Sequence, residues 1–277
     1  MGSGKMNKKE ALLTALRSYK SAAIAFSGGV DSSTLIKAAF LALGDQAVAV
    51  TAVSELLTPA ELNDAKEIAA RVGIRHVVLT VPDLENRLFV ENNKERCYYC
   101  KQTRFRLLCD WAKENGFAVV LEGSNLDDAG DYRPGMRALH ENDFVASPLV
   151  DARLHKPEIR ALAKAWDLPV WDKPSAACLA SRIAYGIPVT AERLSQVGQG
   201  EEILRRYFPY GQLRLRHHGD IARIEVESIE IAKIAQPRIR EEIVKEIKAL
   251  GFAFVAIDME GYRMGSQNEI LFQDDKR

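Results

Sequence analysis

Three of the four cysteines in this chain of 277 residues stand where a thiol could do chemistry. Cys97 and Cys100 form a Cys-x-x-Cys pair at the start of a predicted helix, and a helix N-terminus favours the thiolate, which is both metal ligand and nucleophile. Cys178 lies in a long irregular loop near Arg182, a setting that suits a reactive thiol better than a packed one. These positions predict metal binding, redox chemistry or sulfur chemistry.

The position of the fourth cysteine and the number of available ligands limit which kind of metal or redox site the cysteines could form. Cys109 shares an apolar helical face with Phe105, Leu108 and Ala112, so we expect it in the core. If the other three converge, their thiolates would hold a 4Fe-4S cluster with one iron left open, because such clusters otherwise take four cysteines. A zinc site would need a fourth ligand, and a redox dithiol needs only the Cys-x-x-Cys pair. From the residues alone, cluster, zinc and dithiol stay equally open.

A candidate phosphate cradle is formed by Ser27-Gly28-Gly29-Val30-Asp31-Ser32, which lies between a predicted strand and a predicted helix. Two glycines let the backbone approach a ligand closely, the free N–H groups of the helix favour an anion, and Ser27 and Ser32 add hydroxyl donors. Asp31 would repel phosphate unless it caps the helix or holds Mg²⁺ bridging to the phosphates, and we favour the magnesium role. The alternative is a capped Gly-Gly turn without a ligand.

Arginines near the C-terminal end form a candidate anion site. Arg214 and Arg216 are two apart in a predicted strand and so project from one face. Guanidinium forks match phosphate geometry, and together with Ser181 and Arg182 they could hold a phosphate group. A solvated strand face is the alternative.

A further polar loop follows a predicted strand end. Its residues Asp128 and Arg133 could meet ATP or the cation, although an ordinary polar loop would look the same.

The elements around these residues alternate short β-branched runs with helical patterns, which predicts an α/β fold with a parallel sheet flanked by helices. The predicted strands are Ala22 to Phe26, Ala47 to Val53, Arg75 to Thr80, Phe117 to Glu122 and one near Val170. The predicted helices are Asp31 to Leu43, Pro59 to Val72, Tyr98 to Asn115 and Pro157 to Trp166.

The pattern changes beyond Pro169, which predicts a second domain. We expect a nucleotide-binding domain over residues 1–171, a linking loop with Cys178 over 172–188, and a small α+β domain over 189–277. The elements expected in the small domain are helices at Ala191 to Tyr207 and Pro237 to Leu250, and strands at Gln212 to His217, Ile221 to Val226 and Ala253 to Asp258. We expect a frayed tail from Gly265 to Arg277.

Composition narrows the class of partner. Thirty-eight basic residues balance 38 acidic ones, so net charge gives no reason to expect nucleic-acid binding, and a small substrate is favoured. No apolar run is long enough to span a membrane, and the polar start Met1 to Lys9 lacks the apolar stretch of a secretory signal. We therefore expect a cytoplasmic protein.

Several motifs together resemble one family. The glycine loop is similar to the pyrophosphate loop of the N-type ATP pyrophosphatases. The later motifs resemble the sulfur transferases that mature the nickel-pincer nucleotide of lactate racemase, called LarE, over nearly the whole chain. Those motifs are Glu122-Gly123-Ser124-Asn125-Leu126-Asp127-Asp128, Asp131-Tyr132-Arg133-Pro134-Gly135, Cys178-Leu179-Ala180-Ser181-Arg182, Leu213-Arg214-Leu215-Arg216 and Asp220-Ile221-Ala222-Arg223-Ile224-Glu225.

The resemblance implies an ATP-dependent sulfur transferase. It would adenylate the carboxylates of pyridinium-3,5-biscarboxylic acid mononucleotide, release pyrophosphate, and convert them to thiocarboxylates. Some family members carry the three cysteines and use a 4Fe-4S cluster as sulfur relay, whereas others sacrifice one cysteine, at the position of Cys178, as sulfur donor. The resemblance also adds Glu202 to the substrate pocket, with an exposed helix charge as the alternative, and implies a homo-oligomer.

Other functions are also compatible with the glycine loop. The enzymatic alternatives are a transfer-RNA thiolase, which neutral charge and the lack of paired Cys-x-x-Cys motifs disfavour, and an amidating synthetase, which would need free ammonia. A noncatalytic ATP-binding or iron-sulfur carrier module is the alternative from another class.

Overall fold

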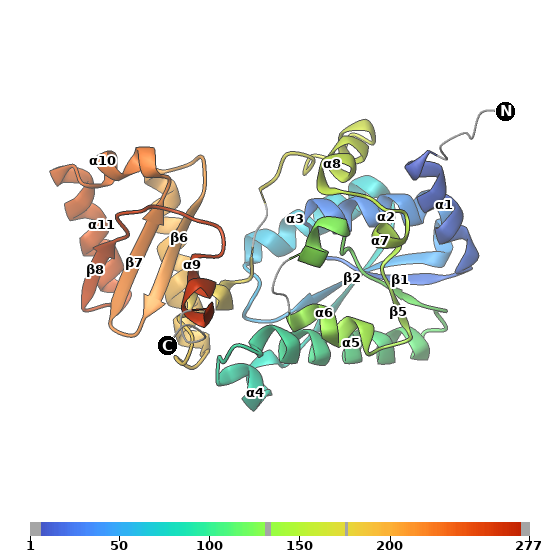
Figure 1. Cartoon of the computed structure of the whole chain (residues 1–277), viewed down its shortest axis with the longest axis horizontal. Coiled ribbons are helices and arrows are strands. Elements are labelled where there is room, and N and C mark those ends of the chain that lie inside the picture. The colour runs from blue at the N-terminus through green and yellow to red at the C-terminus, as the bar shows by residue number, and fades with distance from the viewer. Residues whose placement is uncertain (1–6, 131–133, 175–176, 273–277) are drawn as a thin grey trace. The chain divides into compact units, whose positions relative to one another are not determined.

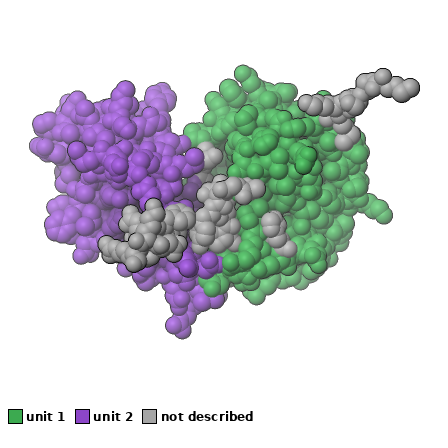
Figure 2. Space-filling view, viewed as in Figure 1, with its two compact units in different colours: residues 1–83, 97–176 green, residues 84–96, 177–277 purple. Residues whose placement is uncertain are grey.

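The computed structural model describes residues 7–130, 134–174 and 177–272. The chain forms two compact units, one of residues 1–83 with 97–176 and the other of residues 84–96 with 177–277 (Figure 2). The segment 84–96 thus belongs to the C-terminal unit, although it lies within the N-terminal half of the chain. Among the described helices, none is long and apolar enough to cross a membrane.

The first unit is built on a parallel sheet of five strands. In sequence order they are β1 (Ala22–Ala25), β2 (Ala47–Val53), β3 (Arg75–Thr80), β4 (Val120–Leu121) and β5 (Val145–Ala146). Their spatial order is β3-β2-β1-β4-β5, and every neighbouring pair is parallel. The chain order reverses between β1 and β4, and open α/β sheets bind ligands at the carboxyl ends of the strands beside such a switch point.

Helices cover both faces of this sheet (Figure 1). The α-helices of the first unit are α1 (Lys8–Ser18), α2 (Val30–Leu43), α3 (Pro59–Val72), α5 (Arg96–Glu114), α6 (Pro134–His140), α7 (Pro148–Asp151) and α8 (Lys156–Ala165), of which α5 starts one residue inside the other unit. Its 3-10 helices are η1 (Gly44–Gln46), η2 (Asp83–Glu85) and η3 (Leu126–Gly130), with η2 running into the other unit. The predicted α/β fold with a flanked parallel sheet is confirmed.

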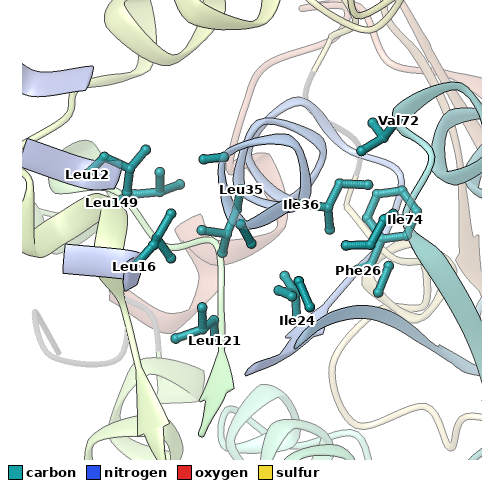
Figure 3. Packing of buried hydrophobic residues seen from close by; sticks show 14 of the residues in the cluster. Leu12, Leu16, Ile24, Phe26, Leu35, Ile36, Val72, Ile74, Leu121 and Leu149 are labelled. Atoms are coloured by element: carbon teal, nitrogen blue, oxygen red, sulfur yellow. The ribbon is translucent and has the colours of Figure 1, made fainter. Parts of the chain in front are cut away.

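The alternation of side chains along β1 produces two cores. Ile24 points to one face, where Leu35 and Ile36 of α2 pack together with Leu16 of α1 and Ile74 (Figure 3). Successive strand residues face opposite sides, so Ala23 packs against α5 on the other face, together with Leu108, Cys109 and Ala112. Cys109 is 2% exposed, which confirms that it is a core residue.

Several elements of the first unit differ from the predictions, which contained none of α1, α6, α7 and β5. The fifth strand is Val145–Ala146, and the strand predicted near Val170 is wrong. Val170 is buried, but it contributes to the core from a turn. The helix α1 was not predicted, although its buried residues Leu12, Leu13 and Leu16 follow helical spacing and Asn7 caps its N-terminus.

The second unit is a small α+β domain. Its strands β6 (Leu213–His218), β7 (Ile221–Val226) and β8 (Phe254–Ile257) form a mixed sheet in the order β6-β7-β8, antiparallel between β6 and β7 and parallel between β7 and β8. Its helices are α4 (Arg87–Val90), α9 (Ala191–Tyr207), α10 (Ile231–Ile234) and α11 (Pro237–Ala249), with 3-10 helices η4 (Leu179–Arg182), η5 (Ser228–Glu230) and η6 (Ser266–Phe272). The expected tail therefore contains ordered structure at η6.

Candidate functional site

The glycine loop lies at the switch point, between β1 and α2. Gly28 has φ +72°, which favours glycine, and a Cβ there would contact Ala65 of α3 at 3.4 Å. Gly29 is the N-cap of α2 and supplies no capping side chain. Gly123 follows β4, and a Cβ on it would come within 3.2 Å of the backbone nitrogen of Ser32. The start of α2 therefore has no side-chain cap, as an anion-binding helix N-terminus requires, and the loop after β4 packs against it.

The hydroxyl groups of the loop are linked to each other. The Ser27 Oγ and Ser32 Oγ atoms are 3.2 Å apart, and the Ser27 N–H donates to Ser32 Oγ at 3.3 Å. Ser32 also donates to the Gly29 carbonyl at 3.2 Å. The structure thus brings together the predicted residues Ser27, Gly28, Gly29 and Ser32.

Asp31 has two oxygens in different environments. Its Oδ2 pairs with the Nζ of Lys156, the first residue of α8. Its Oδ1 is buried and has no hydrogen-bond partner among the described residues. A carboxylate oxygen is the ligand type that Mg²⁺ prefers, and an unpartnered one inside a phosphate cradle fits such a cation. The donor set therefore fits the magnesium role.

The polar loop after β4 is organised around Asn125 and Asp127. Asp127 accepts hydrogen bonds from His155 Nδ1 at 2.6 Å and from the Lys156 N–H at 2.7 Å, and these bonds lower the pKa of the Asp127 carboxyl. Asp128 Oδ2 accepts from the Asn125 N–H at 3.0 Å. This arrangement fixes the start of α8, and with it Lys156, beside the glycine loop. Arg133 lies outside the described residues.

A buried carboxylate supports the same edge of the sheet. Glu122, at the end of β4, is 4% exposed. It accepts hydrogen bonds from the Ser124 N–H at 3.0 Å, from Ser124 Oγ at 2.7 Å and from Ser147 Oγ. These bonds hold the turn whose Gly123 packs against Ser32.

The Cys-x-x-Cys pair lies in the first two turns of α5, where Cys97 is exposed and Cys100 is half-buried. The Cys100 thiol donates to Asp83 at 3.9 Å. Asp83 is 1% exposed and also accepts from Arg104, at 2.5 Å from Nη2, one turn further along the helix. Gly135 of α6 packs close by, because a Cβ there would lie 3.2 Å from the Cys97 carbonyl.

Cys178 is exposed and precedes η4 in the second unit. Its carbonyl accepts from Ser181 Oγ at 2.7 Å and from Arg182 Nη1 at 3.1 Å. Arg182 is 4% exposed and forms a two-pronged ion pair with Glu201, through Nε at 2.8 Å and Nη2 at 3.1 Å. The predicted residues Cys178, Ser181 and Arg182 are thus packed into one turn.

Arg214 and Arg216 do project from the face of β6 opposite to Leu213 and Leu215, which lie in the core. Arg216 pairs with the fully buried Glu225, with 2.8 Å between Arg216 Nη2 and Glu225 Oε2, and donates to the Ser181 carbonyl at 3.1 Å. The two arginines are therefore buried, not solvated as the alternative required.

Arg214 differs from Arg216 in having no ion pair among the described residues. It is 6% exposed, donates to the Leu213 carbonyl at 2.6 Å and lies over the Tyr262 ring at 5.1 Å. Burial, with Arg182 and Arg216 nearby, lowers the pKa of Arg214. A buried cation without a carboxylate partner is costly, and a bound anion would offset that cost.

Glu202 is exposed on α9, where it lines a shallow hollow with Gln199, Ile203 and Arg206. Its neighbour Glu201 makes the contact to Arg182. Sequence reasoning missed Glu201, as well as Lys156 and Glu225. Glu225 alternates with the apolar residues of its strand, which is the signal that could have placed it on the arginine face.

The cysteines are divided between the units. Cys97 and Cys100 belong to the first and Cys178 to the second. Within the described ranges, no group of three metal-ligating side chains is assembled.

A glycine loop after the first strand of a parallel sheet, at its switch point, is typical of nucleotide-binding α/β proteins, and the comparisons identify the PP-loop class. A family model described as Asparagine synthase matches residues 9–131. The pyridinium-3,5-bisthiocarboxylic acid mononucleotide synthase of Lactiplantibacillus plantarum is 35% identical over 266 residues, covering 95% of each chain. The chain belongs to the family of this synthase, the LarE family.

Two uncharacterised proteins are similar over most of their length. One from Synechocystis sp. is 40% identical over 250 residues, covering 90% of this chain and 92% of that protein. One from Methanocaldococcus jannaschii is 31% identical over 240 residues, covering 87% and 90%.

Proposed function

We propose that the protein is an ATP-dependent sulfur transferase that acts on pyridinium-3,5-biscarboxylic acid mononucleotide. The observation that carries the proposal is the glycine loop at the start of α2, where one buried oxygen of Asp31 has no hydrogen-bond partner among the described residues. Membership of the LarE family and the buried arginines of the second unit support it.

The first unit would bind ATP. The N–H groups at the start of α2 and the Ser27 and Ser32 hydroxyls would hold the phosphates, Asp31 would hold Mg²⁺, and Asp128 and Arg133 would complete the site. Mg²⁺, when bound, neutralises phosphate charge. Lys156, released from Asp31 by the cation, would be free to pair with a phosphate oxygen.

The reaction would have two steps. In the first, a carboxylate oxygen of the substrate bonds to the α-phosphorus of ATP, the bond to the β-phosphate breaks, and pyrophosphate leaves. In the second, sulfur bonds to the activated carbonyl carbon and AMP leaves, which gives a thiocarboxylate.

The second unit would bind the phosphate of the mononucleotide. Arg214 and Arg216 are the proposed prongs, with Ser181 and Arg182 beside them and Glu202 as the outermost residue of the site. The support is that Arg214 is buried among cations and that, in the described part of the chain, no carboxylate pairs with it. Glu225 and Glu201 would orient Arg216 and Arg182.

The cysteines would handle the sulfur. We infer that Cys97, Cys100 and Cys178 together hold a 4Fe-4S cluster, since two of these thiols are exposed and the third is half-buried. Such a cluster, when bound, would supply sulfide. Sacrifice of the sulfur atom of Cys178 is the competing route, with which the exposed position of Cys178 is also compatible.

The test is to incubate anaerobically purified protein with ATP, Mg²⁺ and the dicarboxylate mononucleotide. Pyrophosphate and AMP should form in equal amounts, and mass spectrometry should show oxygen replaced by sulfur in the mononucleotide. Pyrophosphate release that does not depend on the mononucleotide would contradict the proposed substrate. Absence of release with any carboxylate would favour a noncatalytic carrier.

A further inference from the structure

The segment 84–96 packs against the loop of residues 178–187, which we name the thiol loop. Both belong to the second unit, although about 80 residues of the first unit separate them along the chain. Two backbone hydrogen bonds join the segment to this part of the chain. The Gly186 N–H donates to the Asn92 carbonyl at 3.1 Å, and the Val189 N–H, just beyond the loop, donates to the Val90 carbonyl at 2.9 Å. The segment therefore acts as a scaffold for the loop.

Asn92 is the centre of this contact. It is completely buried and has φ +54°, a left-handed conformation that asparagine tolerates better than most residues. Its Nδ2 donates to the carbonyls of Ile187 at 2.7 Å and Ala184 at 2.9 Å, and lies 3.3 Å from that of Ile183. One side chain thus contacts carbonyl groups at three positions of the thiol loop. Buried polar groups need such hydrogen-bond partners.

Arg96 extends the contact toward Cys178. Its Nη1 donates to Asn92 Oδ1 at 2.6 Å and to the Ala180 carbonyl at 2.9 Å, within η4. Its guanidinium lies 5.3 Å from the centre of the Tyr185 ring, and the residue is 5% exposed. Ala180 is two residues from both Cys178 and Arg182, so Arg96 holds the turn that carries both.

We propose that Asn92 and Arg96 are positioning residues for sulfur transfer, which rests on the function proposed above. They fix the backbone of the thiol loop, and through it the direction of the Cys178 thiol and of the Ser181 and Arg182 side chains. The Cys178 side chain is exposed, so the backbone must supply its orientation. Arg96 is followed directly by Cys97, so the same segment leads into the Cys-x-x-Cys pair.

The variants follow from the local geometry. Asn92→Gly removes the amide without strain, because glycine accepts the positive φ. Arg96→Ala removes the donor to Ala180, and Arg96→Lys retains a cation that can donate to one carbonyl. Arg87→Ala is the matched control, because Arg87 belongs to the same segment and its side chain is 90% exposed.

Four measurements test the proposal. Hydrogen exchange of residues 178–187 and the alkylation rate of Cys178 by iodoacetamide report on the loop without any substrate. Titration with the mononucleotide and with ATP separates the two ligands. Single-turnover sulfur transfer at saturating substrate separates the chemical step from binding.

Asn92→Gly and Arg96→Ala should speed exchange in the thiol loop and change the alkylation rate of Cys178. They should raise the Kd for the mononucleotide about tenfold and slow sulfur transfer, with ATP binding unchanged. Arg96→Lys should recover part of each effect, and Arg87→Ala should match the wild type.

A merely structural role would lower the melting temperature while leaving the mononucleotide Kd and the transfer rate unchanged below melting, and that result would overturn the proposal. Loop exchange equal to that of Arg87→Ala would also overturn it. If Arg96→Ala does not fold, Asn92→Gly and Arg96→Lys carry the test. A wild-type protein that ignores the mononucleotide would refute the proposed function, while exchange and alkylation would still decide whether the two residues hold the loop.

Discussion

The Nζ of Lys156 pairs with Oδ2 of Asp31, although the two residues are 125 positions apart in the chain. Both side chains are 25% exposed, so the pair is partly shielded from water. Lys156 neutralises one oxygen of the carboxylate while the other, buried oxygen has no described partner. Lys156 therefore supplies a positive charge beside Asp31, at the site where the proposed magnesium ion would bind. When that ion binds Asp31, Lys156 would be able to pair with the phosphates of ATP instead.

Replacing Asp31 with Asn should abolish magnesium-dependent pyrophosphate release and leave the fold intact. The amide keeps the size of the side chain but loses the charge that a divalent cation requires. Pyrophosphate release should be measured over a range of magnesium concentrations, with circular dichroism as the check of folding. Near wild-type rates in the variant would refute the cation role of Asp31.

Replacing Lys156 with Met should have two opposite effects. Pyrophosphate release at saturating magnesium should fall about fivefold, because the variant loses the proposed ion pair between Lys156 and a phosphate oxygen of ATP. A partly buried ion pair contributes about 1 kcal/mol. The magnesium concentration giving half-maximal rate should decrease, because Asp31 no longer pairs with the lysine. A magnesium midpoint that rises would mean that Lys156 only holds Asp31 in place.

The extent to which the fold could be predicted depends on the length of each element. The strands β2 and β3 have the predicted bounds, because β2 is a run of valine, alanine and threonine and β3 combines Val77, Val78 and Thr80 directly after a helix end at Gly73. β5 pairs over only two residues, Val145 and Ala146, and so gives no periodic signal. Val170 gave a false signal, because an apolar residue after a proline can pack from a turn as well as from a strand.

The part of the candidate site that one local motif forms could be predicted from the sequence. The part formed by segments that are distant in the chain could not. The glycine loop needs only the residues between β1 and α2. Lys156 and Asn92 act on partners roughly 90 to 125 positions away, and a single sequence contains nothing that pairs them. Glu201, whose carboxylate contacts Arg182, is a further residue that no local motif indicated.

Arg214→Ala and Arg216→Ala should both weaken mononucleotide binding and spare ATP binding, but they should differ in stability. Each lost charged hydrogen bond contributes about 1.5 to 3 kcal/mol, which is roughly tenfold to hundredfold in Kd. Arg216→Ala should also lower the free energy of unfolding by about 3 kcal/mol, because it strips a partner from buried Glu225. Arg214→Ala breaks no described ion pair, so the change should be about 1 kcal/mol or less.

Calorimetric titration of each ligand and urea denaturation measure these two effects. Arg214→Ala is thus the cleaner probe of phosphate binding. Equal losses of mononucleotide and ATP affinity in Arg214→Ala would show that the arginine supports the fold instead of the substrate.

Lowering the pH should destabilise the second unit through His217. Burial in that unit lowers the pKa of His217 to about 4, from its ordinary value near 6.5. Between these values the unfolded chain binds a proton that the folded chain does not, so the free energy of unfolding falls as the pH drops from about 6.5 to about 4, by up to about 3 kcal/mol. His218, which lies in the same unit and whose pKa is also lowered by burial, adds to the same slope.

The His217→Asn variant tests this pH dependence. Asparagine keeps an acceptor for the Gly219 N–H, which donates to His217 Nδ1 at 3.2 Å, and it does not titrate in this range. Urea denaturation at several pH values should give a shallower slope for the variant. An unchanged slope would place the titrating group elsewhere.

Variants of the three cysteines outside the core should distinguish a cluster from sacrifice of Cys178. If Cys97, Cys100 and Cys178 jointly hold a cluster, anaerobically prepared protein should be brown and carry about four irons per chain, the count expected for a cubane on cysteine thiolates. Changing any one of them to Ala should then remove both iron and sulfur transfer while sparing pyrophosphate release. Cys109→Ala is the matched control, because Cys109 lies in the core and should change neither.

Sacrifice predicts a different pattern for the same variants. Only Cys178→Ala would stop transfer, turnover would end after one sulfur per chain, and intact-mass measurement would show loss of hydrogen sulfide at Cys178. Because the exposed Cys178 thiol can serve either route, its mass after reaction is the deciding measurement. Unchanged mass with repeated turnover on added sulfide would support the cluster, and dehydroalanine at Cys178 in an iron-free, active protein would refute it.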